Sequence, residues 1–274
     1  MYDLLIIGGG PAGLSAAMTA RNRNLSVCVI CGGAADSALY KAGHVTNYPG
    51  VPDVSGPALL ETMTQQARAL GADILRERAL SAMPMGKTFG VSAGKEFAEG
   101  RALLLATGIA QRGTFPGEAE FLGRGVSYCA TCDGMLYRGK PVAVVGYTDT
   151  ARQEAEFLQK IGCSVTYFDR PKQCEIRGDG RVESVTCDGR TIPAEGVFIL
   201  RPTMAPTELF PGLAVEQGYV TVDRRMATNL PGLFAAGDCT GGPLQVSKAA
   251  GDGLIAGQSA AAWAAAQERR EKQS

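Results

Sequence analysis

Cys129 and Cys132, separated by two residues, are the side chains in this sequence best placed for chemistry. One helical turn brings sulfur atoms at this spacing together, and a neighbouring helix N-terminus favours the reactive thiolate. A four-cysteine zinc site would need a second pair, and Cys28 with Cys31 falls on an expected strand, where this spacing points side chains to opposite faces. We therefore expect a redox-active pair at Cys129 and Cys132. We expect the other cysteines to be mostly small buried hydrophobic residues: Cys28, Cys31, Cys163, Cys174, Cys187 and Cys239.

The run Gly8-Gly9-Gly10-Pro11-Ala12-Gly13 has the spacing of a dinucleotide-binding turn. It follows an expected strand at residues 3–7 and begins an expected helix that ends near residue 22. The first glycine allows a tight turn, the second lets backbone amides reach a pyrophosphate, and the third lets helix and strand pack closely. The acidic residue expected at the end of the next strand is missing, because that strand ends in Cys31-Gly32-Gly33. The motif predicts a dinucleotide without identifying it.

Apolar runs and helical periodicity predict two strand–helix–strand units, the first at the N-terminus and the second beginning at Pro141. Further strands are expected at residues 102–106, 197–200 and 233–236, and helices at 57–70 and 245–265. The charged residues 268–274 are expected to fray. The predicted fold class is α/β, with two Rossmann-like three-layer nucleotide-binding domains, the second inserted in the first. The predicted domains are 1–112 with 221–274, and 113–220.

Composition excludes several classes of function. The 27 Lys and Arg residues balance 27 Asp and Glu residues, so the chain lacks the basic excess that nucleic acids or anionic membranes attract. His44 is the single histidine, which argues against histidine-rich metal sites and a Ser-His-Asp triad. Neither a signal peptide nor a run of about 20 apolar residues is evident, so we expect a cytoplasmic protein.

Several motifs occur in a familiar order: the glycine run at 8–13, Asn47-Tyr48-Pro49-Gly50, Ala106-Thr107-Gly108, Cys129-Ala130-Thr131-Cys132-Asp133-Gly134 and Ala236-Gly237-Asp238. Together they resemble the low-molecular-weight thioredoxin reductases over nearly the whole chain. That resemblance implies an FAD domain, a pyridine-nucleotide domain that carries the cysteine pair, and a homodimer. It also implies thioredoxin as the partner whose disulfide is reduced.

The resemblance assigns roles to individual residues. Cys132 would face the flavin and take its electrons, Cys129 would attack the thioredoxin disulfide, and Asp133 would be the acid–base group. The cofactor-binding residues would lie at the pyrophosphate, beside the flavin and at the ribityl end: Gly8, Gly10, Pro11, Ala12, Gly13, Asn47, Thr107, Gly108, Gly237, Asp238, Gln245 and Val246.

The second domain departs from the family pattern for binding NADPH in four places. Thr148 stands where a glycine would let the pyrophosphate approach, and Asp169-Arg170-Pro171-Lys172 replaces a basic cluster. Too few residues separate Arg170 from Val185 for the expected elements, and the strand at 197–200 runs into Arg201 instead of a glycine turn. These losses indicate a domain that folds and carries the cysteines without binding the nucleotide.

A branch of the family, the ferredoxin-dependent flavin thioredoxin reductases, also lacks a working nucleotide site. The segments 225–229 and 237–245 resemble that branch, and a flavin can accept single electrons and pass on a pair. The sequence therefore favours ferredoxin as the donor. Three alternatives stay open: an NADPH-dependent thioredoxin reductase with an eroded motif, an FAD-dependent dithiol oxidase that uses oxygen, and an FAD-holding redox sensor or scaffold.

Overall fold

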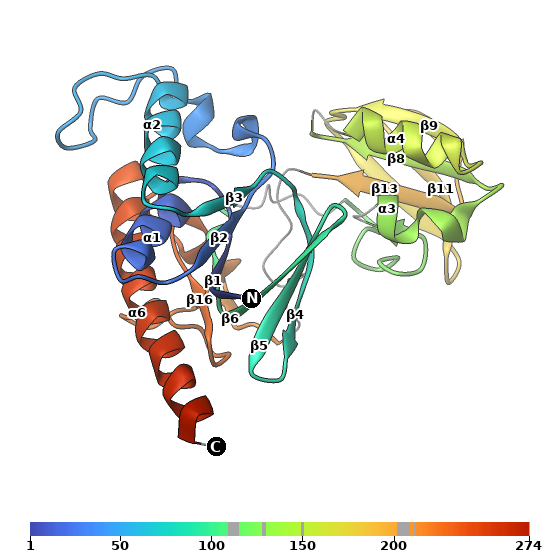
Figure 1. Cartoon of the computed structure of the whole chain (residues 1–274). Helices are drawn as coiled ribbons and strands as arrows, with labels where there is room; N and C mark the ends of the chain where they lie inside the picture. The colour runs from blue at the N-terminus through green and yellow to red at the C-terminus, as the bar shows by residue number, and fades with distance from the viewer. Residues whose placement is uncertain (109–114, 128–129, 149–150, 202–208, 211, 274) are drawn as a thin grey trace. The chain divides into compact units, whose positions relative to one another are not determined.

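The computed structural model describes residues 1–108, 115–127, 130–148, 151–201, 209–210 and 212–273. The chain divides into two compact units (Figure 1). The first unit comprises Met1–Ala110 and Thr203–Ser274, and the second comprises Gln111–Pro202. The second unit is thus inserted in the first.

A seven-stranded sheet forms the centre of the first unit, in the order β3-β2-β1-β6-β5-β4, with β16 also pairing with β6. Strands β3, β2, β1, β6 and β16 are parallel, whereas β4 and β5 form an antiparallel extension of β6. The strands are β1 (Tyr2–Ile7), β2 (Val27–Ile30), β3 (Asp73–Leu75), β4 (Ala79–Met85), β5 (Thr88–Ala93), β6 (Glu96–Leu105) and β16 (Leu233–Ala235).

Helices α1 (Pro11–Arg21), α2 (Gly56–Ala69) and α6 (Val246–Gln273) contribute to one hydrophobic core with the sheet. Figure 1 shows α1 and α6 side by side. Gly253 and Gly257 allow this approach, because a Cβ at either position would lie 2.1 or 2.8 Å from a carbonyl oxygen of α1. The prediction that residues 268–274 fray was wrong as far as Gln273, since α6 continues through these good helix formers. No described helix is long and apolar enough to cross a membrane.

The other side of this sheet packs against residues 209–210 and 212–220 of the same unit. Leu209, Phe210, Leu213 and Val220 are buried in one cluster with strand residues of the first unit. The chain therefore rejoins the first unit before the boundary that we expected at residue 221. Short elements in this unit are η1 (Ala34–Asp36), η2 (Leu39–Lys41), β14 (Val215–Glu216), β15 (Tyr219–Val220) and η4 (Asp238–Thr240).

The second unit contains a four-stranded parallel sheet in the order β7-β13-β8-β9, with a core cluster on each face. Between β9 and β13 the chain forms an antiparallel three-stranded sheet, β10-β11-β12. The elements are β7 (Val126–Ser127), α3 (Ala130–Asp133), η3 (Gly134–Tyr137), β8 (Pro141–Gly146), α4 (Ala151–Lys160), β9 (Ser164–Asp169), β10 (Cys174–Gly178), β11 (Val182–Cys187), β12 (Arg190–Pro193) and β13 (Gly196–Leu200). The predicted α/β class is confirmed.

A disulfide joins Cys174 of β10 to Cys187 of β11. The two residues are register partners in the antiparallel pair, and both are buried. The prediction that these two cysteines are merely small hydrophobic residues was therefore wrong, because the strand register places their Cα atoms 4.2 Å apart. By contrast, Cys28, Cys31, Cys163 and Cys239 are free thiols.

Candidate active site

The glycine turn at the carboxyl end of β1 leaves the start of α1 open. A Cβ at Gly8, whose φ is 120°, would lie 2.1 Å from the carbonyl oxygen of Ala106, and a Cβ at Gly13 would lie 1.9 Å from that of Gly8. Gly10 differs, since the nearest atom to its Cβ position is Ser37 Oγ at 3.8 Å. Gly10 also provides no side-chain cap for the first-turn amides of α1. Two glycines are thus required by packing, and the third leaves space at the uncapped start of α1.

Two polar atoms at the ends of neighbouring strands are buried without a partner in the part of the chain that the structure describes. They are Thr107 Oγ1, after β6, and Asp238 Oδ1, after β16. Burial raises the pKa of the Asp238 carboxyl, the positive charge of Lys248 lowers it, and the negative charge of Asp252 raises it. Buried polar atoms normally have hydrogen-bond partners, so these two atoms indicate a bound polar group.

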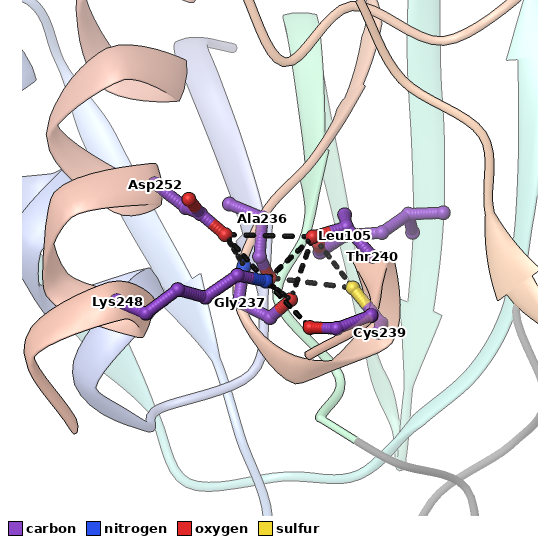
Figure 2. Close-up of polar contacts among 8 residues, drawn as sticks. Leu105, Ala236, Gly237, Cys239, Thr240, Lys248 and Asp252 are labelled. Carbon is purple, nitrogen blue, oxygen red and sulfur yellow. Dashed lines mark hydrogen bonds and ion pairs between the residues drawn. The ribbon is translucent and has the colours of Figure 1, made fainter. Parts of the chain in front are cut away.

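The turn that carries Asp238 is held by two side chains of α6 (Figure 2). Lys248 Nζ donates to the carbonyl oxygens of Gly237 and Gly241, at 2.9 and 2.7 Å, and to Thr240 Oγ1 at 3.0 Å. It also forms an ion pair of 2.8 Å with Asp252 Oδ2, which accepts from the Gly237 amide at 3.2 Å. The turn is therefore fixed through both its amide and its carbonyl groups.

Other predicted cofactor residues lie in the same unit. Asn47 Nδ2 donates to Gln245 Oε1 at 2.7 Å, which joins positions far apart in sequence, and Val246 begins α6. At the end of β2, where an acidic residue was expected, Cys31 Sγ would lie 2.8 Å from a Cβ at Gly9. The space next to the glycine turn is therefore occupied by a thiol, and Gly9 is also required by packing.

The predicted redox pair lies in the second unit. Cys129 lies outside the described residues, and Cys132 belongs to the one-turn helix α3, of which the structure does not describe this side chain. The Asp133 carboxylate accepts a hydrogen bond of 2.7 Å from Ser127 Oγ of β7. Immediately afterwards, Met135 and Leu136 of η3 are 59% and 70% exposed. The predicted cysteine pair is thus followed directly in the sequence by an oriented carboxylate and two exposed apolar side chains.

Aromatic side chains lie near the carboxyl ends of β8 and β9 in the second unit. Tyr147, after β8, donates from its hydroxyl group to the Pro171 carbonyl at 2.6 Å and stacks on Phe115 with 6.4 Å between ring centroids. The hydroxyl of Tyr167 would lie 2.3 Å from a Cβ at Gly146, so that ring packs directly on the turn. Thr148 is buried. Ligands of open parallel sheets bind at these carboxyl ends, and here Tyr147 and Tyr167 lie at the ends of β8 and β9.

A buried ion pair lies directly after β13. Arg201, after β13, donates two hydrogen bonds to the carboxylate of Glu118, which also accepts from the Phe115 amide at 2.8 Å. The Arg201 guanidinium lies over the Phe115 ring, 5.0 Å from its centroid. Because a bidentate pair fixes both groups, Arg201 is a structural component of this edge.

Comparison with known proteins agrees with this architecture. The family model of pyridine nucleotide-disulphide oxidoreductases matches residues 2–175 and 170–253. The chain belongs to this family. A thioredoxin reductase of Listeria innocua is 36% identical, with 95% of this chain and 93% of that protein covered.

Two solved structures are similar over almost the whole chain. A ferredoxin-flavin thioredoxin reductase from Clostridium acetobutylicum has a TM-score of 0.89 and 37% identity, with 97% of this chain and 98% of that chain covered. A thioredoxin reductase from Gloeobacter violaceus has a TM-score of 0.82 and 34% identity, with 95% and 93% covered. The two units are thus the two Rossmann-like nucleotide-binding domains of the pyridine nucleotide-disulphide oxidoreductases.

The thioredoxin reductases of this family are flavoproteins with FAD as their cofactor, and the residues of the first unit fit FAD. The space at Gly10 and the uncapped N-terminus of α1 suit a pyrophosphate, while Thr107 Oγ1 and Asp238 Oδ1 offer unused hydrogen-bonding capacity to hydroxyl or ring groups. Sequence reasoning missed Lys248 and Asp252, although their separation of four residues on one helix was a readable signal. It also missed Ser127 and the ring cluster of the second unit, which depend on contacts distant in sequence.

Proposed function

We propose that the protein is a flavin-dependent thioredoxin reductase that takes its electrons from ferredoxin and not from a nicotinamide nucleotide. The observation that carries the choice of donor is that Tyr147 and Arg201, at the carboxyl edge of the second unit, already have partners within the chain. A nucleotide that used either of these side chains would first have to break the hydrogen bond of Tyr147 or the ion pair of Arg201 with Glu118. Breaking a buried pair of this kind by removing one partner costs about 3–5 kcal/mol, which would count against binding.

Backbone and charge support the same proposal. The turn after β8 holds Tyr147 and the buried Thr148 where the family's glycine would admit a pyrophosphate. The Asp169 carboxylate, at the end of β9, forms a 3.6 Å ion pair with Arg152. An acidic side chain at this place repels a ribose phosphate. Its partner Arg152 is already paired with it and so is not available to bind that phosphate. The solved ferredoxin-flavin thioredoxin reductase is a relative of similar length and fold.

The reduction itself is thiol–disulfide exchange. The Cys129 thiolate attacks one sulfur of the thioredoxin disulfide, forming a mixed disulfide and releasing the other sulfur as a thiolate. Cys132 then attacks Cys129, so that thioredoxin leaves as a dithiol and the enzyme retains a Cys129–Cys132 disulfide. Two electrons regenerate the pair, and FAD supplies the ability to collect them singly and deliver them together. Asp133, oriented by Ser127, would supply and remove the protons.

The surface next to this pair supports a protein substrate. Met135 and Leu136 are exposed directly after Asp133, and exposed apolar side chains beside a reactive group are typical of transient protein docking. Replacing both with serine should raise the KM for thioredoxin. It should leave the rate with a small disulfide unchanged, since a small disulfide needs no docking surface. Assembly as a homodimer is also part of the proposal, and a solution mass of twice the chain mass would support it.

The deciding experiment is an anaerobic titration of the flavin absorbance with NADPH, NADH and reduced ferredoxin in separate cuvettes. We expect bleaching by ferredoxin alone, and reduction of thioredoxin that disappears in Cys129→Ser. Rapid bleaching by NADPH would instead establish the nicotinamide-dependent enzyme. If neither donor bleaches the flavin but a small dithiol does, with oxygen consumed on turnover, the protein is a dithiol oxidase. A pair that changes redox state without turnover would indicate a sensor.

A further inference from the structure

We propose that Lys248 and Asp252 are positioning residues for the flavin, which hold the Gly237–Gly241 turn so that the Asp238 carboxylate accepts a hydrogen bond from a ribityl hydroxyl group. The proposal rests on the FAD site of the first unit and does not depend on the electron donor. Figure 2 shows the two side chains projecting from α6 onto the turn.

The Lys248 ammonium group is fully engaged inside the protein. Its three N–H donors face four acceptors, which are two carbonyl oxygens, one hydroxyl and the Asp252 carboxylate. The side chains of Lys248 and Asp252 are only 20% and 13% exposed. Because an amine held in this way cannot turn toward water, Lys248 is a fixed internal charge, unlike an ordinary helix-surface lysine.

The pair links Asp238 to the glycine turn that precedes α1. Gly237, with a φ of 83°, packs so closely that its Cβ would lie 2.8 Å from the Ala12 side chain. The Gly237 amide donates to Asp252, and its carbonyl oxygen accepts from Lys248. One pair of side chains thus sets the position of Asp238 relative to the amides that suit the pyrophosphate.

Charge supports the same assignment. Among the described residues, the charged groups that act on Asp238 are Lys248 and Asp252, both from α6, and its neighbours on the turn are Cys239 and Thr240. Burial and Asp252 raise the pKa of Asp238, whereas Lys248 lowers it. Lys248 therefore favours the ionised carboxylate, which is the form that accepts hydrogen bonds on both oxygens.

The test measures FAD binding to the apo-protein by fluorescence quenching, across a range of pH, in Lys248→Met and Asp252→Asn. At neutral pH each variant should bind FAD at least about tenfold more weakly, because each loosens the turn. The affinity should fall with decreasing pH as Asp238 is protonated. The midpoint of that fall should move to higher pH in Lys248→Met and to lower pH in Asp252→Asn. Lys95→Met, at a surface turn, is the matched control and should match wild type.

Opposite movement of the two midpoints separates positioning at Asp238 from general damage, which would weaken binding in both variants without such a split. The double variant Lys248→Met/Asp252→Asn removes both charges of the ion pair together, so it provides a folded protein if a single variant does not fold. Its midpoint should lie between those of the single variants, with affinity still reduced. Wild-type affinity in the single variants, or midpoints that move together, would overturn the proposal.

Discussion

The Cys174–Cys187 disulfide should contribute a large part of the stability of the second unit. The two cysteines are 13 residues apart, and cross-linking a loop of about this length removes chain entropy from the unfolded state worth about 3 kcal/mol. In a domain of about 60–100 residues, each kcal/mol moves the melting temperature by about 4–8 °C. Replacing both cysteines with alanine should therefore lower the melting transition of the second unit by more than about 10 °C.

Calorimetry of the whole protein measures this, with the transition of the first unit as an internal reference. Cys163→Ala is the matched control, since it removes a buried sulfur of the same unit that forms no disulfide, and it should cost about 1 kcal/mol. Without reductant, a tryptic digest should contain the peptide Gln173–Arg177 linked to Val182–Arg190. Alkylation of both thiols before any reduction, or equal melting of the double variant and the control, would refute the reasoning.

Four further outcomes are expected. Gly13→Ala should lose bound flavin, measured by the absorbance ratio at purification, because its Cβ meets the Gly8 carbonyl at 1.9 Å. Arg201→Met should destabilise the second unit by about 3–5 kcal/mol in urea, and adding Glu118→Gln should restore part of that loss. Burial raises the pKa of Asp238, so its ionised form opposes folding above the unfolded-state pKa; Asp238→Asn should therefore melt no lower than wild type as apo-protein at neutral pH, yet bind FAD more weakly. FAD at 100 times its Kd should stabilise the apo-protein by about 2.7 kcal/mol, whereas NADPH should give no thermal shift.

Local pattern was sufficient to predict most of the framework. Buried parallel strands appear in sequence as short apolar runs, so β1, β8 and β13 could be placed from those runs alone. The alternation of side chains along β2 correctly separated Cys28 from Cys31, which pack against different core clusters. The glycine run was also informative, because close backbone contacts require glycine at two of its positions: Gly8 against Ala106, and Gly13 against Gly8.

Contacts set by long-range register could not be predicted in this way. Nothing in the spacing of Cys174 and Cys187 reveals that β10 and β11 pair with these residues opposite each other. Likewise, the sequence does not distinguish Lys248 from an ordinary helix lysine, because its contact with the Gly237–Gly241 turn is evident only in the folded structure. The ring stack of Phe115 and Tyr147 joins residues on different segments, so only the folded structure reveals it.

The two units differ at the carboxyl ends of their parallel strands. At the carboxyl ends of its parallel strands, the first unit leaves Thr107 Oγ1 and Asp238 Oδ1 buried and unsatisfied among the described residues. At the corresponding ends in the second unit, Tyr147 and Arg201 already have partners within the chain. Buried polar groups without partners lower the stability of the fold, and a ligand that forms hydrogen bonds with them restores it. A ligand that must first break existing hydrogen bonds binds less favourably. A bound dinucleotide would stabilise the first arrangement, and we propose that the second unit has no corresponding need, so that electrons enter at the flavin itself.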